Sequence, residues 1–410
     1  MDQRASAAVR NGATDVAGTT VEFECDVVDL FVAALRGALK QEAAVVGTEN
    51  LLAALVMGDT DAGAAIAPGM RKAGSLSGLI AGRGGRGWVS DDGDEDAGAT
   101  VAAGADDDEV TAAWREAHWR LGPAKRGPAA DVARELPGMT GALRRCLLLA
   151  LAAARAEGTV PVRCRHVVRA LLDLPESRAR EALVLQKLDL AAAATALDAL
   201  DASAPAETEL PESRGVTLLR RAGTLGRSGN RLTRALTSWT SGAGVYGSPI
   251  VFAVTVEAVR QAVRCGRSAA EPVDLLLGIL ALDRSLAVAG RPLPEDLAAA
   301  NSAAALLRRH GVRQDSLTRA AMERTPTAPA DSASASDRDA GQVRLSDSAE
   351  RAKAVAQLTA VEHGSPSVGT VHLLAALLEA EGTEVVRLLS AASRVDVAAL
   401  RAELPRRAGA

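Results

Sequence analysis

Aromatic side chains are almost absent from this sequence of 410 residues: Phe, Trp and Tyr make up 2% of it, although apolar residues make up 48%. β-Sandwiches and β-barrels normally use aromatic and β-branched residues to fill their interiors. The apolar interior of this chain must instead be built from Ala, Leu and Val, and Ala and Leu are strong helix formers. The composition therefore predicts an all-α protein, long enough for two or three domains.

Cysteine is also scarce, and its four copies are scattered without a CxxC pair. Cys146 and Cys164 stand 18 positions apart among arginines, which is a poor spacing for zinc ligands. We therefore expect buried free thiols, a reducing compartment, and neither a metal nor another cofactor.

Long hydrophobic runs are missing as well. The longest, Cys146 to Ala154, is bracketed by arginines and is about half the length that spans a bilayer. The N-terminal residues are polar and lack the apolar core of a signal peptide. These features predict a cytoplasmic protein that makes no membrane contact.

Motifs of catalysis are absent too. The sequence contains no GxxxxGK[ST] phosphate loop, no HExxH and no GxSxG, and its five histidines are spread along the chain. We therefore expect a protein that is not an enzyme and has no catalytic residues. An enzyme of an unrecognised class remains an alternative that no group of residues supports.

The net charge of −4 argues against a generally basic nucleic-acid binder. One Arg-rich segment, residues 214–234, is the exception, and Arg220, Arg221 and Arg234 are its candidate partner-binding residues. Arginines without interleaved aromatics give only weak, salt-sensitive binding to nucleic acid. Three uses of this segment stay open: a contact with an acidic partner or phosphate, pairing with the acidic residues of 91–109, and a solvated helix face.

Changes in composition divide the chain into helical segments and linkers. We expect linkers in three stretches: one Gly-rich and acidic, one Arg-rich, and one rich in Pro, Ser and Ala. The expected order is a disordered tail at 1–20, repeat 1 at 21–81, a linker at 82–109, repeat 2 at 110–200, a linker at 201–248, repeat 3 at 249–324, a linker at 325–342 and repeat 4 at 343–406.

The repeats share a pattern: an amphipathic helix, a short turn and a compact leucine-rich helix. The stretch from Gly47 to Leu55 reads GTENLLAAL and that from Gly369 to Leu377 reads GTVHLLAAL, with seven identities in nine positions. The stretches from Arg163 and from Glu271 keep mainly the apolar rhythm. We expect Thr48 and Thr370 to be N-caps.

These strings resemble the repeat of the Clp amino-terminal domain, in which a glycine, a hydroxyl residue, Glu and His precede a run of leucines. In that family two repeats form one helical domain, so four copies imply two tandem domains, here without the ATPase modules. The family's domain docks adaptors and tagged substrates, including in some members arginine-phosphorylated ones. The resemblance therefore implies a non-catalytic protein- or peptide-binding module: an adaptor, decoy or sequestering protein for a Clp protease system. The alternative is a nucleic-acid-associated regulator that uses residues 214–234.

In the members that bind phosphoarginine, the motif's Glu is expected to engage the guanidinium. Only Glu49 occupies that place here; the equivalents are Arg165, Val273 and Val371. Thr48 and Glu49 are therefore the candidate ligand-binding residues, and a solvent-exposed Glu that favours the helix dipole is the alternative. His166 and His372 fall at the motif's His place, where we expect packing or a hydrogen bond within the repeat.

Trp114 and Trp119 stand out among so few aromatics. They are candidate partner-binding residues on an exposed stripe of a helix. The alternative is that they cover the apolar core of the second repeat.

Overall fold

The computed structural model describes residues 21–58, 60–70, 74–83, 87–90, 92–93, 104–122, 137–159, 161–203, 212–225, 248–324, 343–379, 383–393 and 395–404. These residues form helices joined by turns and a few two-residue strands, so the predicted all-α class is confirmed. The expected tail at 1–20, the linker at 325–342 and Arg234 lie outside the described residues. The chain forms two compact units, here called the N-terminal unit, Val21–Glu209, and the C-terminal unit, which takes in residues from Leu210 onward.

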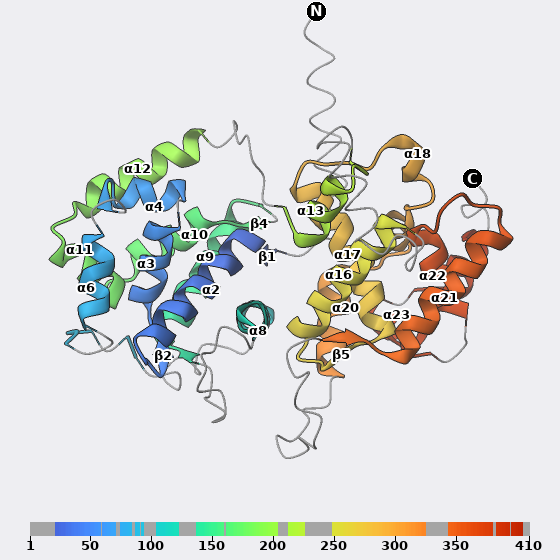
Figure 1. Ribbon diagram of the computed structural model, residues 1–410, viewed down its shortest axis with the longest axis horizontal. Helices are drawn as coiled ribbons and strands as arrows, with labels where there is room; N and C mark the ends of the chain where they lie inside the picture. The colour runs from blue at the N-terminus through green and yellow to red at the C-terminus, as the bar shows by residue number, and fades with distance from the viewer. Residues whose placement is uncertain are drawn as a thin grey trace, which may run out of the picture. The chain divides into compact units, whose positions relative to one another are not determined.

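The N-terminal unit contains two copies of one arrangement of elements (Figure 1). The first copy comprises β1 (Glu22–Phe23), α2 (Cys25–Lys40), β2 (Val45–Val46), α3 (Thr48–Met57), α4 (Asp61–Ile66) and α6 (Ser75–Arg83). The second comprises β3 (Gly138–Met139), α9 (Gly141–Ala156), β4 (Pro161–Val162), α10 (Cys164–Asp173), α11 (Arg178–Leu185) and α12 (Leu190–Ser203). The first four elements of the second copy each begin 116 positions after their counterparts in the first.

The two copies exchange strands. β1 pairs in parallel with β4, and β2 pairs in parallel with β3. Each strand therefore pairs with a strand of the other copy, which is the reciprocal arrangement that a pseudo-twofold axis produces. The two copies fold as one body because neither can complete its own ladders alone.

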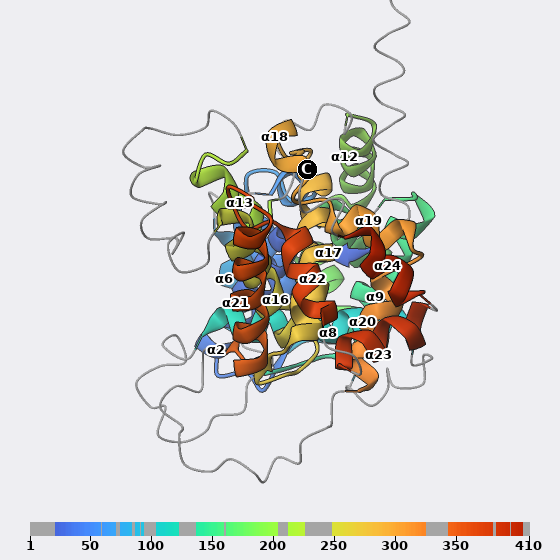
Figure 2. The ribbon, with the colours of Figure 1, turned by 90° about the vertical axis from the view of Figure 1, so that its right-hand side faces the viewer.

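The C-terminal unit also holds two copies. The first comprises α16 (Pro249–Arg264), β5 (Ala269–Ala270), α17 (Pro272–Val288), α18 (Glu295–Ala298), α19 (Ala303–Arg309) and α20 (Gln314–Glu323). The second comprises β6 (Arg344–Leu345), α21 (Asp347–Glu362), α22 (Thr370–Glu379), α23 (Glu384–Ser393) and α24 (Val397–Glu403). α21 and α22 begin 98 positions after α16 and α17, and β5 pairs in parallel with β6. α16, α17, α21 and α22 pack together at the centre of this unit (Figure 2).

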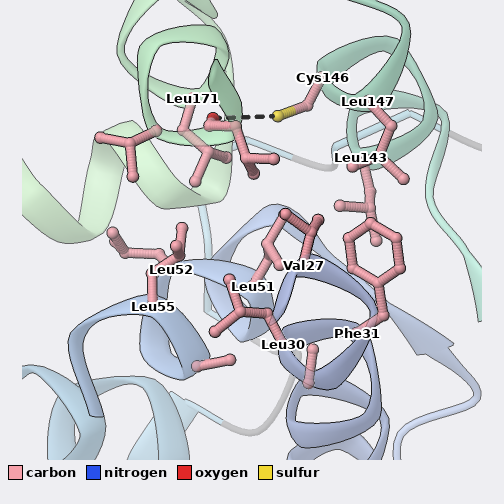
Figure 3. Packing of buried hydrophobic residues seen from close by; sticks show 14 of the residues in the cluster. Val27, Leu30, Phe31, Leu51, Leu52, Leu55, Leu143, Cys146, Leu147 and Leu171 are labelled. Carbon is pink, nitrogen blue, oxygen red and sulfur yellow. Dashed lines mark hydrogen bonds between the residues drawn. The ribbon is translucent and has the colours of Figure 1, made fainter. Parts of the chain in front are cut away.

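The core of each unit is aliphatic, as the composition requires. In the N-terminal unit, α3 directs Leu51, Leu52 and Leu55 inward, and none is more than 1% exposed. Figure 3 shows these side chains with the apolar side chains of α2, α9 and α10. Burying one such leucine stabilises the fold by roughly 2 kcal/mol. The spacing i, i+1, i+4 gives α3 a broad apolar face and leaves its first turn to make polar contacts.

Two segments expected to be linkers contain packed helices. α8 (Ala105–Leu121) begins inside the expected linker 82–109 and packs against α2. α13 (Arg214–Arg221) lies inside the expected linker 201–248 and packs against α16 through buried Val216 and Leu219. Those expectations rested on the glycines, prolines and runs of like charge in these segments. A helix with a charged outer face needs only a few apolar residues on its inner face to pack.

Candidate functional site

The four related strings all begin at the N-terminus of a leucine-rich helix. In each, the third residue of the helix accepts a hydrogen bond from the backbone N–H of the residue just before the helix. The pairs are Gly47 N to Asn50 Oδ1 at 3.0 Å, Arg163 N to His166 Nδ1 at 2.9 Å, Glu271 N to Asp274 Oδ2 at 2.9 Å and Gly369 N to His372 Nδ1 at 3.0 Å. Asn, His and Asp all supply a short-reach acceptor, so this position caps a helix. The expected hydrogen bond of His166 and His372 within the repeat is present.

The prediction that Thr48 and Thr370 are N-caps is wrong: each is the first residue of its helix, and Gly47 is the N-cap of α3. Thr48 is fully buried and its N–H and hydroxyl both donate to the carboxylate of Asp92, at 2.8 and 3.0 Å. The Thr48 oxygen also accepts a hydrogen bond from Ala179 N at 3.0 Å. Thr48 therefore joins the N-terminus of α3 to that of α11 and to a carboxylate from another part of the chain.

The Asp92 carboxylate accepts hydrogen bonds from the N-termini of three helices. Besides the two bonds from Thr48, the hydroxyl of Thr140, the N-cap of α9, donates to Asp92 at 3.1 Å, and the N–H of Arg178, the first residue of α11, donates at 2.9 Å. Asp92 is only 3% exposed. We call this set of donors, the N-termini of α3, α9 and α11, the Asp92 cradle. Helix N-termini favour negative charge because their free N–H groups converge there.

Glu49 lies at the edge of the Asp92 cradle and is 3% exposed, so the alternative of a solvent-exposed Glu is wrong. Burial, followed by the neighbouring Asp92 carboxylate, raises the pKa of Glu49 to about 7, although the Arg178 guanidinium opposes this. The contact between Arg178 and Glu49 Oε1 is long, 3.5 Å, and Glu49 Oε2 has no hydrogen-bond partner among the described residues. The site thus combines donors for an anion with a buried acceptor that is not satisfied.

The glycine that begins the motif has a steric role. A Cβ at Gly47 would lie 2.1 Å from Glu49 Oε2. A Cβ at Gly369 would likewise lie 2.1 Å from the backbone oxygen of Ala300. Glycine at these positions therefore lets an oxygen approach the start of α3 and of α22.

Asp92 reaches the cradle on a short segment, residues 87–90 and 92–93, here called the strap; Asp91 lies outside the described residues. Val89 N and Ser90 N donate to Glu181 Oε2 at 2.9 and 3.2 Å, and Glu181 also pairs with Arg83. Asp92 itself has a φ of +64°, in the left-handed region, which costs a non-glycine residue roughly 1 kcal/mol. The strap was expected to be disordered, and it instead brings a carboxylate into the site.

The other three N-termini are also filled by the chain. At α22, Thr370 N donates to Asn301 Oδ1 at 3.0 Å, and Ala303 N donates to the Thr370 hydroxyl at 3.4 Å. At α17, the Glu271 carboxylate accepts from the hydroxyls of Ser346 and Ser348 at 2.8 and 2.9 Å. At α10, the Cys164 thiol donates to Asp26 at 3.5 Å. The four sites therefore share a geometry and differ in what fills them.

The tryptophans mark the core rather than an exposed stripe. Trp114 is 8% exposed, and its ring lies 6.2 Å from that of Phe31 and 5.3 Å from that of His118. Trp119 is partly buried. Trp114 therefore covers the apolar core of the N-terminal unit, as the alternative stated, although that core includes the first copy as well as the second.

The Arg-rich segment is partly neutralised within its own unit. Arg220 Nε donates to Glu212 Oε2 at 2.8 Å, and the same carboxylate group pairs with Arg291. Arg221 is exposed at the last turn of α13. Neither arginine belongs to the Asp92 cradle.

A shallow cavity of about 670 Å³ lies between α2, α3 and α6. Its lining is mostly small or apolar, with Met57 and Ile80 in it, and Lys40 stands at its edge. This cavity adjoins α3 but contains none of the donors of the Asp92 cradle.

Catalytic chemistry finds no support in the described part of the chain. No group of three His, Cys, Asp or Glu side chains there could hold a metal ion. Burial raises the pKa of Cys146 and of Cys164 above that of an ordinary thiol, which makes both poor nucleophiles. None of the described helices is both long and apolar enough to cross a membrane.

Sequence reasoning found Thr48 and Glu49 and missed their neighbours. Thr140 carried a signal, because a threonine before an apolar helix is a frequent N-cap. Asp92 and Arg178 carried none, since their role depends on contacts with α3 that span 44 and 129 positions. Comparison with known proteins adds no homologue: no family model, no curated protein and no solved structure matches the chain.

Proposed function

We propose that the chain is a non-catalytic protein- or peptide-binding module, similar to the docking domain of Clp unfoldases, that acts as an adaptor, decoy or sequestering protein in a Clp protease system. The observation that carries the proposal is the polar site at the start of α3, where the motif residues Thr48 and Glu49 lie together with converging donors. The paired copies within each unit support the tandem-domain interpretation.

The chemistry of this site fits a ligand that carries an anion next to a cation. The N–H groups of Thr48 and Arg178 and the hydroxyl of Thr140 are donors for an anion, and Glu49 Oε2 is an acceptor that has no donor in the described part of the chain. Charge-assisted hydrogen bonds of this kind are roughly twice as strong as neutral ones. A phosphorylated arginine side chain presents both groups, so it is the ligand class we propose.

Two assays test this function. Capture from cell extract with the tagged full chain should recover Clp unfoldase or protease subunits, or arginine-phosphorylated proteins. Calorimetry with free phosphoarginine should detect binding by the wild type that Glu49→Gln weakens at least tenfold. Arg221→Gln, which removes an exposed charge outside the site, is the matched control. Recovery of neither class of protein, together with equal binding by Glu49→Gln, would contradict the proposal.

The alternative function, a nucleic-acid-associated regulator, depends on the arginines of residues 214–234. The pairing of Arg220 with Glu212 reduces the charge that this segment presents. Unchanged DNA mobility in a low-salt gel shift would remove this alternative.

A further inference from the structure

The Asp92 carboxylate is bound by the starts of helices in the way that a separate anionic ligand would be. Every donor to its carboxylate belongs to the start of a helix, whereas the carboxylate itself belongs to the strap, which is neither helix nor strand. The donors come from both copies: Thr48 from the first, and Thr140 and Arg178 from the second. The donors of the Asp92 cradle therefore belong to the two repeated copies, whereas Asp92 belongs to the segment between them.

The strap fills the cradle imperfectly. Glu49 is 3% exposed, and one of its carboxylate oxygens has no hydrogen-bond partner within the described ranges. The same holds for the buried Trp88 Nε1 on the strap. A buried polar atom left unsatisfied costs about 1–3 kcal/mol, so the closed arrangement contains unrealised hydrogen bonds that another occupant can supply.

Apolar burial holds the strap at one residue. Trp88 packs against the apolar core of the N-terminal unit and under the Arg83 guanidinium, with 4.9 Å between that group and the ring, whereas Val89 is 94% exposed. Near the surface the strap makes hydrogen bonds with Glu181 and with the Glu176 carbonyl.

The strap is also bonded to the start of α9. The N–H groups of Ala142 and Gly141 donate to the carbonyls of Asp92 and Gly93, at 2.8 and 3.3 Å. Displacing Asp92 therefore breaks contacts between the strap and the helices, but no hydrogen bond within a helix.

The other occupants cannot leave in this way. Asp26 belongs to α2 and Glu271 is the N-cap of α17, so removing either carboxylate would disrupt a helix. Asn301 directly precedes Ser302, the N-cap of α19. Asp92 and Asn301 both lie outside the helices, and of these two only Asp92 is charged.

We propose that the Asp92 cradle binds the anionic group of a peptide ligand, and that the strap closes it with its own carboxylate. This inference rests on the proposed docking function and adds its regulation: the anion of a partner, phosphate or carboxylate, must displace Asp92 to bind. An intramolecular occupant on a short tether competes at an effective concentration of about 1 mM, so weak partners are excluded.

Calorimetry with a capped peptide Trp-Val-Ser-Asp-Asp-Gly, the sequence of residues 88–93, tests the proposal. The full-length wild type should bind it only near 1 mM or more weakly. The full-length Asp92→Ala variant should bind it at least tenfold more tightly, because its cradle is empty. A peptide with Ala at the position of Asp92 should not bind. Asp91→Ala, which removes the neighbouring charge, is the matched control and should behave as wild type.

Two results would overturn the proposal: Asp92→Ala binding no more tightly than wild type, or equal binding of the peptide that lacks the Asp92 carboxylate. The peptide assay contains no Clp subunit. Its result is therefore independent of whether the chain captures Clp subunits from cell extract. Failure of the peptide assay alone refutes the strap's role, and failure of capture alone refutes the docking partner.

A second measurement uses the wild type and does not depend on the folding of a variant. Chymotrypsin cleavage after Trp88 should accelerate several-fold with saturating peptide or with inorganic phosphate, compared with chloride at equal ionic strength. Release of Trp88 from under Arg83 exposes the bond. A cleavage rate at Trp88 that neither ligand changes would contradict displacement.

Discussion

The starts of α3 and α22 are the most similar pair among the four related strings, and they differ in the charge at the site. Each begins Gly-Thr, and in each the first helical N–H donates to a side-chain oxygen, Asp92 at 2.8 Å or Asn301 at 3.0 Å. At α3 the occupant is an anion and the second helical residue is Glu49. At α22 the occupant is a neutral amide and the second residue is Val371. The comparison shows how one scaffold becomes either a polar site or a plain helix start.

The reason for the difference is electrostatic. Val371 is fully buried and its N–H donates to the Ala300 carbonyl at 3.1 Å. The α22 site is thus closed by backbone and amide groups that carry no charge. At α3, Glu49 and Asp92 are two carboxylates near each other, with the Arg178 guanidinium close to Glu49. A site that holds adjacent charges is costly to bury and is therefore a candidate for function.

The largest expected effect comes from putting the acidic residue into the neutral site. Val371→Glu buries a carboxylate beside the uncharged Asn301, with no arginine in the place of Arg178. We expect a loss of about 3–5 kcal/mol in the free energy of unfolding. Urea denaturation measures it, with Val371→Leu as control. A loss below 1 kcal/mol would show that the two helix starts tolerate charge equally.

The next effect compares the two occupants. Asp92→Ala leaves donors of Thr48, Thr140 and Arg178 without an acceptor, and we expect it to lower stability by about 2–3 kcal/mol. Asn301→Ala leaves one principal donor, Thr370 N–H, and should cost about 1 kcal/mol. Thermal unfolding of both variants provides the test. An equal cost would mean that the cradle's additional donors contribute nothing.

Glu49→Gln should change how stability depends on pH. The pKa of Glu49 is raised from 4.5 to about 7 in the folded state, so the folded state holds the proton more tightly. The wild type therefore loses stability as pH rises from about 4.5 to about 7, by up to roughly 3 kcal/mol, and no further above that. Glu49→Gln lacks this loss.

The stability difference between Glu49→Gln and wild type, measured in urea from pH 4.5 to pH 8, should therefore move in favour of the variant and level off above pH 7. Val371→Gln serves as the control in the neutral site and should show no such trend. A flat difference across this range would place the Glu49 carboxylate in a solvated environment.

The smallest effect concerns the shared cap. Asn50→His and His372→Asn exchange the acceptors that receive the Gly47 and Gly369 N–H groups. Because both side chains supply an acceptor at this position, each exchange should cost only about 0.5–1 kcal/mol. Leucine at either position removes the acceptor and should cost more. Thermal unfolding of the four variants checks the order, and equal costs of polar and apolar replacements would contradict the capping role.

The sequence predicted the helices and the position of the four related strings, because apolar spacing and N-terminal signals are local. Leu51, Leu52 and Leu55 pack as their spacing indicated. The strap, the first residues of α8 and all of α13 were assigned to linkers, because glycine, proline and charge outweighed the few apolar residues there. The role of Asp92 could not be read locally, since its acidic neighbours resemble a disordered run and its partners lie 44 and 86 positions away.

The most direct test of the central claim, that Asp92 occupies a binding site, is a crystal structure of the full-length Asp92→Ala variant with the peptide Trp-Val-Ser-Asp-Asp-Gly. The account predicts the peptide's carboxylate within hydrogen-bond distance of the N–H groups of Thr48 and Arg178 and the hydroxyl of Thr140. A cradle closed by rearranged side chains, or a peptide bound elsewhere, would contradict it.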